Sequence, residues 1–193
     1  MATATTKARI LAAALDLFNR SGTAEVTTNH IAAEASISPG NLYYHFRNKE
    51  EIIRAVVERQ LDEFDDLWKS SPMLTLEGIQ NVLNDVFALQ WRYRFFLRER
   101  TALLRNDLTL SRRYQEIYRQ RMEQQMAFFQ QFVTAGVVRK SDDPEEMRRL
   151  LMVSWIVSEN WLTFLESIGQ TVDFAQFQEG SITLLSLLKP YLA

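Results

Sequence analysis

The chain has 193 residues, of which 47% are hydrophobic, so it can bury a sizeable core; its formal net charge is −2. The absence of cysteine excludes a disulfide framework and thiolate chemistry. The longest apolar run, 150–157, is too short to span a bilayer, and the N-terminus lacks the apolar core of a signal peptide. We therefore expect a soluble cytoplasmic protein without membrane partners. With only six glycines and four prolines, and no strand-like alternation, the sequence predicts an all-α fold.

The first predicted helix follows Thr5 or Thr6, either of which can act as its N-cap. Its apolar residues recur at the spacing of one helix face, which predicts a side that faces a core: Ile10, Ala14, Leu17 and Phe18. Gly22 is expected to end it. Lys7 and Arg9 lie near its start, where they either contact phosphate or form a solvated pair.

Residues 27–47 read as two short helices joined by a tight turn. Thr27 or Thr28 starts the first. Ser38 is a good N-cap for the second, and Pro39 follows at the position where a missing N–H costs nothing.

The second of these helices has two distinct faces. At about 100° per residue, Leu42 and Phe46 share one face, while Tyr44 and Gly40 lie opposite. This layout is typical of a helix-turn-helix whose second helix enters the major groove. An ordinary helical hairpin with surface tyrosines is the alternative.

The same stretch resembles the DNA-binding domain of the TetR family of bacterial transcriptional regulators, over roughly residues 7–55. The resemblance rests on Thr27, Thr28, Ile31, Ala32, Ala35, the block Leu42-Tyr43-Tyr44-His45-Phe46, and Asn48-Lys49-Glu50. One departure is Ser36, where the family usually has glycine. Serine would be strained there if the turn requires a positive φ.

The resemblance implies an N-terminal three-helix DNA-binding domain and a C-terminal helical domain for ligand binding and dimerisation. It implies phosphate contacts by several side chains and base-edge contacts by others. The predicted DNA-binding residues are Thr27, Thr28, Ser38, Gly40, Asn41, Tyr43, Tyr44, His45 and Lys49. Because residues 1–50 carry five Lys or Arg and four Asp or Glu, a net charge of only +1, affinity must come from local placement of basic side chains and from dimerisation.

A helix capped by Asn48 is expected to run to about Lys69 and to connect the two domains. We predict a DNA-binding domain at 1–50, a connecting helix at 51–70 and a ligand-binding and dimerisation domain at 71–193. The boundary falls near the Ser70-Ser71-Pro72 break. The acidic stretch 62–66 is interpreted as a solvated helix face, because no histidine or nucleophile accompanies it.

Aromatic residues and arginines interleave over 91–100, after a predicted helix at about 75–91. Three readings stay open: a core with arginines outside, a ligand pocket with arginines at its mouth, or stacking on single-stranded nucleic acid. Another long helix is predicted at 108–134. The weakly predicted ligand-binding residues are Phe87, Trp91, Phe95, Arg98, Met122, Met126 and Trp155.

The last two predicted helices, from about 142 to 168 and from about 173 to 188, are strongly apolar. A helix that is apolar nearly all round must be covered on both sides. Too little chain remains to cover both helices, which indicates a homodimer formed through a four-helix bundle; a fully covered monomeric core is the alternative.

Together these features predict a DNA-binding transcriptional regulator that acts on an operator in double-stranded DNA. The resemblance to the TetR family implies a repressor that a small apolar or amphipathic inducer releases from its operator. A helical ligand carrier with a vestigial helix-turn-helix is the alternative. No enzyme, cofactor or metal site is predicted, because the sequence shows no catalytic constellation, phosphate loop or metal-ligand cluster.

Overall fold

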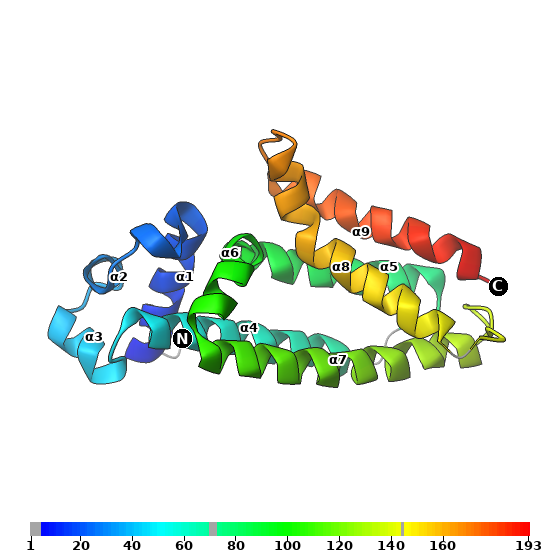
Figure 1. Ribbon diagram of the computed structural model, residues 1–193, viewed down its shortest axis with the longest axis horizontal. Coiled ribbons are helices and arrows are strands. Elements are labelled where there is room, and N and C mark those ends of the chain that lie inside the picture. The colour runs from blue at the N-terminus through cyan, green and yellow to red at the C-terminus, as the bar shows by residue number, and fades with distance from the viewer. Residues whose placement is uncertain (1–4, 70–72, 144) are drawn as a thin grey trace. The chain divides into compact units, whose positions relative to one another are not determined.

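The computed structural model describes residues 5–69, 73–143 and 145–193, and in these ranges the chain is all-α, as expected (Figure 1). The predicted break at Ser70-Ser71-Pro72 lies outside the described residues, as does Pro144. An isolated antiparallel bridge joins Val138 and Leu192. Among the helices of the described ranges, none is both long and apolar enough to cross a membrane.

The described helices agree closely with those expected from the sequence. In chain order they are α1 (Thr6–Glu25), α2 (Thr28–Glu34), α3 (Pro39–His45), α4 (Lys49–Lys69), α5 (Leu76–Arg92), α6 (Arg94–Asn106), α7 (Leu108–Thr134), α8 (Glu146–Ser167), α9 (Phe174–Leu188) and a 3-10 turn, η1 (Lys189–Tyr191). The predicted start of the penultimate helix near residue 142 is wrong, because α8 begins only at Glu146.

Local capping signals explain most of these boundaries. The side chain of Thr5 accepts a hydrogen bond from the N–H of Ala8 (3.2 Å), and Asn48 does the same for Glu51 (2.9 Å). Gly22 takes a φ of +76° within α1, so the helix kinks there and continues for one short turn to Glu25. The expected end at Gly22 is therefore a break and not the end of the helix.

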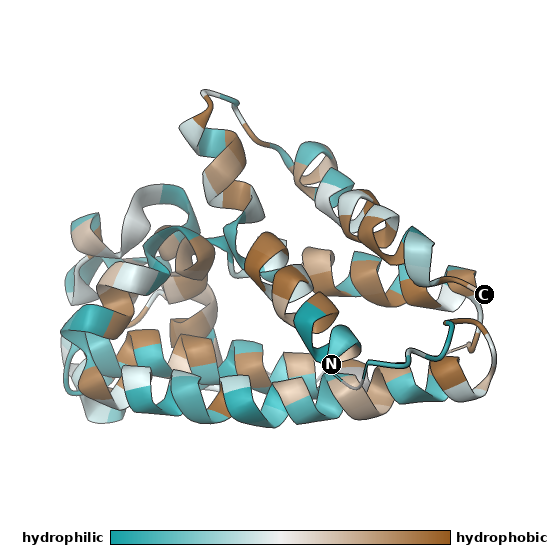
Figure 2. Ribbon diagram, turned by 45° about the vertical axis from the view of Figure 1, so that its right-hand side comes forward, coloured by the Kyte–Doolittle hydropathy of each residue, from teal (hydrophilic) through white to brown (hydrophobic). Residues whose placement is uncertain are grey.

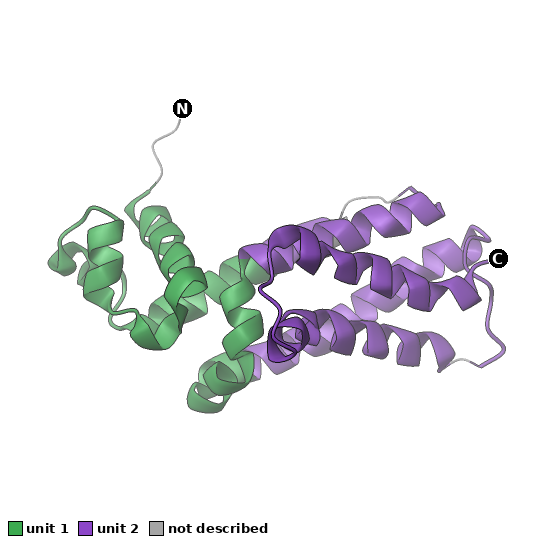
Figure 3. Cartoon of the chain, turned by 90° about the horizontal axis from the view of Figure 1, so that it is seen from above, with its two compact units in different colours: residues 1–62, 93–111 green, residues 63–92, 112–193 purple. Residues whose placement is uncertain are grey.

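The chain forms two compact units (Figure 3). Unit 1 comprises residues up to 62 and 93–111, and unit 2 comprises 63–92 and 112–193. These units are defined by packing, whereas the boundaries predicted after residues 50 and 70 were defined by function. The predicted functional division therefore stays a prediction.

Packing of α6 against α1 explains why residues 93–111 join unit 1. The rings of Phe95 and Phe18 lie 5.3 Å apart, and the N–H of Phe95 donates to Asn19 Oδ1 at 3.0 Å. Tyr93, Phe95 and Phe96 are buried, which confirms the core reading of the aromatic and arginine-rich stretch for these rings.

Unit 2 is built on α5, α7, α8 and α9. Gly180 on α9 allows this helix to approach α5 closely, because a Cβ there would lie 2.2 Å from the ring of Phe87. A cluster of aromatic rings on α7, including Phe128, Phe129 and Phe132, fills the interior next to it.

Candidate DNA-binding surface and ligand pocket

Two short helices, α2 and α3, form a helix-turn-helix in unit 1. Thr27 caps α2 by accepting the N–H of His30 (3.2 Å), and His30 Nδ1 accepts the N–H of Thr27 in return (3.3 Å). Ser38 caps α3 by accepting the N–H of Asn41 at 3.2 Å. In the turn between them Ser36 has a φ of 54°, in the left-handed region. A glycine, which the TetR family usually has at this turn, adopts that conformation without strain.

Arg9 of α1 secures this turn. Its Nη2 donates to the carbonyl of Ala35 at 2.5 Å and to that of Ser36 at 3.3 Å. The guanidinium thus satisfies carbonyls at the end of α2. Sequence reasoning offered only a phosphate contact or a solvated pair for Arg9, because nothing in the pattern indicates that its side chain reaches the turn.

The outward face of α3 carries Tyr44, the most exposed aromatic side chain of the described residues. Leu42 and Phe46 are buried, whereas Tyr44 is 84% exposed and Tyr43 is 49% exposed. The Tyr44 ring stacks edge-on against His45, with centroids 5.1 Å apart. Burial of one face and exposure of the other is the two-sided layout predicted from the spacing.

The remaining predicted DNA-binding residues surround these tyrosines. Thr28 Oγ1 lies 2.9 Å from the hydroxyl of Tyr43, a hydrogen bond that ties α3 to the start of α2. Asn41 is exposed beside Gly40, where an added Cβ would meet nothing closer than 4.0 Å. Packing within the chain therefore does not require the glycine, and its bare backbone is open to solvent.

Lys49 lies at the start of α4 and already makes one hydrogen bond. Its Nζ donates to the carbonyl of Thr23 at 2.6 Å. A lysine ammonium carries three N–H groups, so a phosphate contact is compatible with this bond. The predicted role of Lys49 toward DNA stays a prediction.

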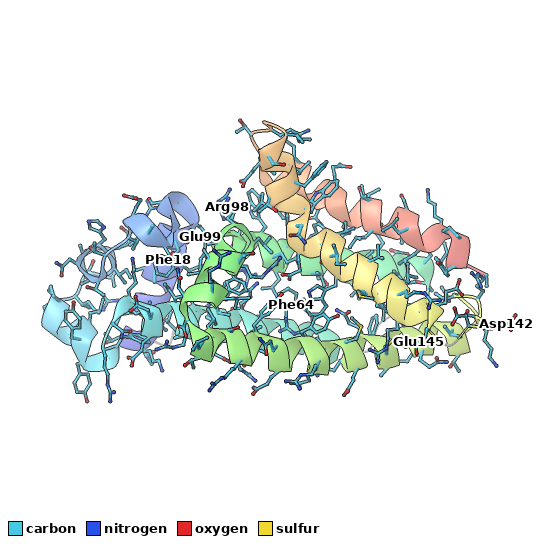
Figure 4. The ribbon with its side chains drawn as sticks, viewed as in Figure 1. Phe18, Phe64, Arg98, Glu99, Asp142 and Glu145 are labelled. Atoms are coloured by element: carbon cyan, nitrogen blue, oxygen red, sulfur yellow. The ribbon has the colours of Figure 1, made fainter. Side chains whose placement is uncertain are left out.

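Thr23 is also held by Glu99 of α6, which is labelled in Figure 4. The carboxylate accepts the N–H of Thr23 at 2.9 and 3.2 Å and the Thr23 hydroxyl as well. Three elements of unit 1, the end of α1, the start of α4 and the middle of α6, are thus joined at one buried residue. Sequence reasoning missed Glu99, because its partner lies 76 residues away.

Unit 2 contains a cavity between its helices. Side chains from five helices line it: Phe64 of α4, Leu83, Val86 and Gln90 of α5, Arg121, Gln125 and Phe129 of α7, Leu151, Ser154, Trp155, Ser158 and Glu159 of α8, and Leu184 and Leu188 of α9. Its walls are mostly apolar with a few polar groups, as is usual for small-molecule sites.

Of the seven weakly predicted ligand-binding residues, Trp155 lines this cavity and the others do not. Phe87 and Trp91 pack against Phe177, with ring centroids 5.1 and 5.4 Å apart. Met122 is buried in the core of unit 2 and Met126 packs against that core. Phe95 and Arg98 belong to unit 1, where Arg98 donates to the carbonyl of Asn19 at 3.3 Å.

The main charge in the cavity wall is Arg121, whose side chain is 8% exposed. It lies over the ring of Phe64 at 4.6 Å, and its Nη2 is 3.7 Å from Asp65. Burial lowers the pKa of Arg121 to about 10, so the guanidinium is still protonated at neutral pH. Glu159 of α8 also lines the cavity and accepts a hydrogen bond from the hydroxyl of Tyr114 at 3.1 Å.

Helices α8 and α9 are rich in hydrophobic residues, coloured brown in Figure 2, and several of their large apolar side chains are exposed. Ile156 is 56% exposed, Phe164 52% and Ile182 52%. Such a concentration on two helices is unusual for a monomer and marks an interaction surface.

Within the described residues, no group of three or more His, Asp or Glu side chains is placed to hold a metal ion.

Comparison with known proteins adds independent information. A family model described as "Bacterial regulatory proteins, tetR family" matches residues 10–56, and one described as "Bacterial transcriptional repressor" (TetR) matches residues 56–193. A crystal structure of a TetR-family transcriptional regulator from Marinobacter aquaeolei is similar to this chain with a TM-score of 0.85 and 36% identity, covering 98% of this chain and 92% of the other.

Two curated relatives match the N-terminal part. The regulator UidR of Escherichia coli is 40% identical over 63 residues, which cover 31% of this chain and 32% of UidR. The regulator QacR of Staphylococcus aureus is 35% identical over 63 residues, which cover 33% of this chain and 34% of QacR. Each match spans about a third of the relative's own length. The proteins of this family are transcriptional regulators and not enzymes. With both family models matched and the helix-turn-helix in place, the chain belongs to the TetR family of bacterial transcriptional regulators.

Proposed function

We propose that this protein is a sequence-specific DNA-binding repressor that acts as a homodimer and leaves its operator when a small, largely apolar molecule binds in unit 2. The observation that carries the DNA-binding part is the exposed face of α3. An 84% exposed tyrosine, Tyr44, lies on a short helix whose other face is fully buried. Such a helix offers its outer side chains to a partner.

In this proposal, α3 enters the major groove. Asn41 pairs with an adenine edge, and the ring of Tyr44 contacts a thymine methyl group. Thr27, Thr28, Tyr43, His45 and Lys49 contact the phosphate backbone, and Ser38 and Gly40 let the start of α3 approach the DNA closely. The hydrogen bond between the hydroxyls of Tyr43 and Thr28 supports this arrangement, because it holds both hydroxyl groups together where α3 meets the start of α2.

The exposed apolar side chains of α8 and α9 support a homodimer. Covering them requires a second apolar surface, and two copies of the same helix pair provide one in a four-helix bundle. A dimer presents two copies of α3 to successive major grooves, about 34 Å apart along B-DNA, so the operator would be a pseudo-palindrome.

The cavity of unit 2 supports ligand control. Its largely apolar lining, with a few polar groups, suits a small organic molecule. A ligand alters DNA binding only if it binds the DNA-competent and the incompetent forms with different affinity. We propose that the ligand favours a form in which the two α3 helices no longer match the groove spacing.

The direct test of DNA binding is Tyr44→Ala. After an operator is selected from genomic fragments, fluorescence anisotropy should show a loss of affinity of about 5- to 150-fold, since a good base contact contributes about 1–3 kcal/mol. Leu108→Ala is the matched control, because Leu108 is also a large exposed apolar residue of unit 1 (71% exposed) but lies outside the helix-turn-helix. Unchanged affinity in Tyr44→Ala, with an unchanged circular dichroism spectrum, would contradict the assignment of α3.

A further inference from the structure

The polar groups in the wall of the cavity in unit 2 restrict the chemistry of its ligand. This inference rests on the ligand-binding part of the proposed function and goes one step further, to the class of molecule. The cavity walls carry three aromatic rings, those of Phe64, Phe129 and Trp155, on three different helices. These rings offer surfaces on which an aromatic ligand can pack (Phe64 is labelled in Figure 4).

One wall residue, Gln90, has an unmet need for a hydrogen bond. It is 2% exposed, and its Oε1 is buried without a hydrogen-bond partner. Buried side-chain acceptors are nearly always bonded to protein or water, so an exception in a cavity wall points to a missing partner in the cavity. A ligand that donates a hydrogen bond to Gln90 Oε1 would supply it.

The charges around the cavity disfavour an anionic ligand. Arg121 already has the carboxylate of Asp65 at 3.7 Å and the ring of Phe64 beneath it. Glu159 is the carboxylate that lines the cavity itself. Arg121 thus already has a carboxylate nearby, and Glu159 would repel an added carboxylate in the largely apolar surroundings of the cavity.

A hydroxyl group meets both conditions. It is uncharged, and it can donate to a carboxamide oxygen and accept from a carboxamide nitrogen. A carboxylate can only accept, and an ether has no proton to donate.

We propose that the ligand of this protein is an uncharged aromatic alcohol of the phenol class, whose hydroxyl donates to Gln90 Oε1 while its ring system lies among Phe64, Phe129 and Trp155. Gln90 is then the residue that selects the head group. The apolar wall accepts a range of ring systems of suitable size.

Three biphenyls separate the possibilities: 4-phenylphenol, 4-methoxybiphenyl and biphenyl-4-carboxylate. They share one ring system and differ in the head group, which is a donor, a blocked donor or an anion. Binding is measured by isothermal titration calorimetry on the full-length protein without DNA. We expect the phenol to bind at least tenfold more tightly than the methyl ether and the carboxylate.

Two variants test the role of Gln90. Gln90→Met retains the length of the side chain without its hydrogen bonds, and Gln90→Leu serves if the methionine variant does not fold. Either should weaken phenol binding about tenfold, leave the ether unchanged and so remove the preference. Gln125→Leu is the matched control, because Gln125 lines the same cavity but is less buried and contains no buried unpartnered atom.

Equal affinity for phenol and ether, tighter binding of the carboxylate, or a phenol preference that survives in a folded Gln90→Met protein would overturn the proposal. Release of operator DNA is measured separately with the same compounds. If the phenol binds with the expected preference but DNA stays bound, the head-group assignment holds and ligand-controlled release fails. If all three release DNA equally, the release holds and the head-group assignment fails.

Discussion

Removing the carboxylate of Glu99 should destabilise unit 1 far more than its partly exposed position on α6 suggests. Glu99 accepts the N–H of Thr23 at 2.9 and 3.2 Å and also the Thr23 hydroxyl, and Thr23 is only 6% exposed. In Glu99→Ala these donors lose a charged acceptor in a place that water reaches poorly. Hydrogen bonds to charged groups contribute about 1.5–3 kcal/mol, so we expect a loss of roughly 2–3 kcal/mol in the free energy of unfolding.

Two further variants calibrate this value. Glu99→Gln keeps one acceptor oxygen for the N–H of Thr23 and should cost only about 1 kcal/mol. Glu25→Ala removes an exposed carboxylate of the same unit, and it should change stability by less than about 0.5 kcal/mol.

Hydrogen exchange is the appropriate assay, because all four tryptophans of the sequence lie in unit 2 and their fluorescence does not report on unit 1. With exchange followed by mass spectrometry on peptides covering Thr23, the amide should exchange about 30- to 150-fold faster in Glu99→Ala than in the wild type, the factor that corresponds to 2–3 kcal/mol. An exchange rate within threefold of the wild-type rate would refute the view that Glu99 holds the end of α1.

Three other predictions concern stability and assembly. Ser36→Gly should raise the free energy of unfolding by up to about 1 kcal/mol and Ser36→Val should lower it by about 1–2 kcal/mol, measured by urea denaturation, because φ is 54° at this position. Asp107→Asn should lower the free energy of unfolding by about 1–2 kcal/mol at pH 7, since Asp107 accepts the N–H of Leu110 at 3.0 Å and pairs with Arg54 at 2.7 Å. Ile156→Glu should convert the dimer to a monomer in sedimentation velocity, because it places a charge in the exposed apolar face of α8.

The pH dependence of Asp107 gives the second of these a sharper test. Burial alone would raise the pKa of Asp107, but hydrogen bonds from Leu110 and Arg54 and the charge of Arg54 outweigh it and lower the pKa. A lowered pKa in the folded state means that the carboxylate stabilises fully above the unfolded pKa of about 4, and that this stabilisation disappears as the pH falls through the folded value. The wild type and Asp107→Asn should therefore converge in stability in acid, and a constant difference down to pH 2 would contradict the assignment.

The controls for the Ser36 and Ile156 predictions use residues of the same chemical kind. Ser38→Gly replaces the N-cap of α3, where glycine is nearly as good, and should change stability by only a few tenths of a kcal/mol. Leu108→Glu adds a carboxylate at an exposed apolar residue of unit 1 and should leave the dimer intact. A stable Ser36→Val protein, or a dimeric Ile156→Glu protein, would count against the respective argument.

The sequence predicted the helices well because their boundaries depend on local chemistry. The caps at Thr5, Thr27, Ser38 and Asn48 act within three residues along the chain, and each is present in the structure. The two faces of α3 follow from helix periodicity, so the exposure of Tyr44 and the burial of Leu42 were also accessible.

The cavity was much less accessible, because its wall comes from five helices and no local pattern records which faces meet. Aromatic residues and methionines on α5 and α7 looked equally suited to core and pocket, and most of them proved to be core. Gln90 gave no signal in the sequence, since a single glutamine within an apolar helix is unremarkable until its burial is known. Glu99 and Arg9 were missed for the same reason: their partners are distant in sequence.

The most direct test of the proposed function is footprinting of the purified protein on genomic fragments selected for binding, at two salt concentrations. The account predicts a protected pseudo-palindrome with two half-sites about one helical turn apart, retained at the higher salt concentration. Weak protection without sequence preference, lost as the salt concentration rises, would contradict it.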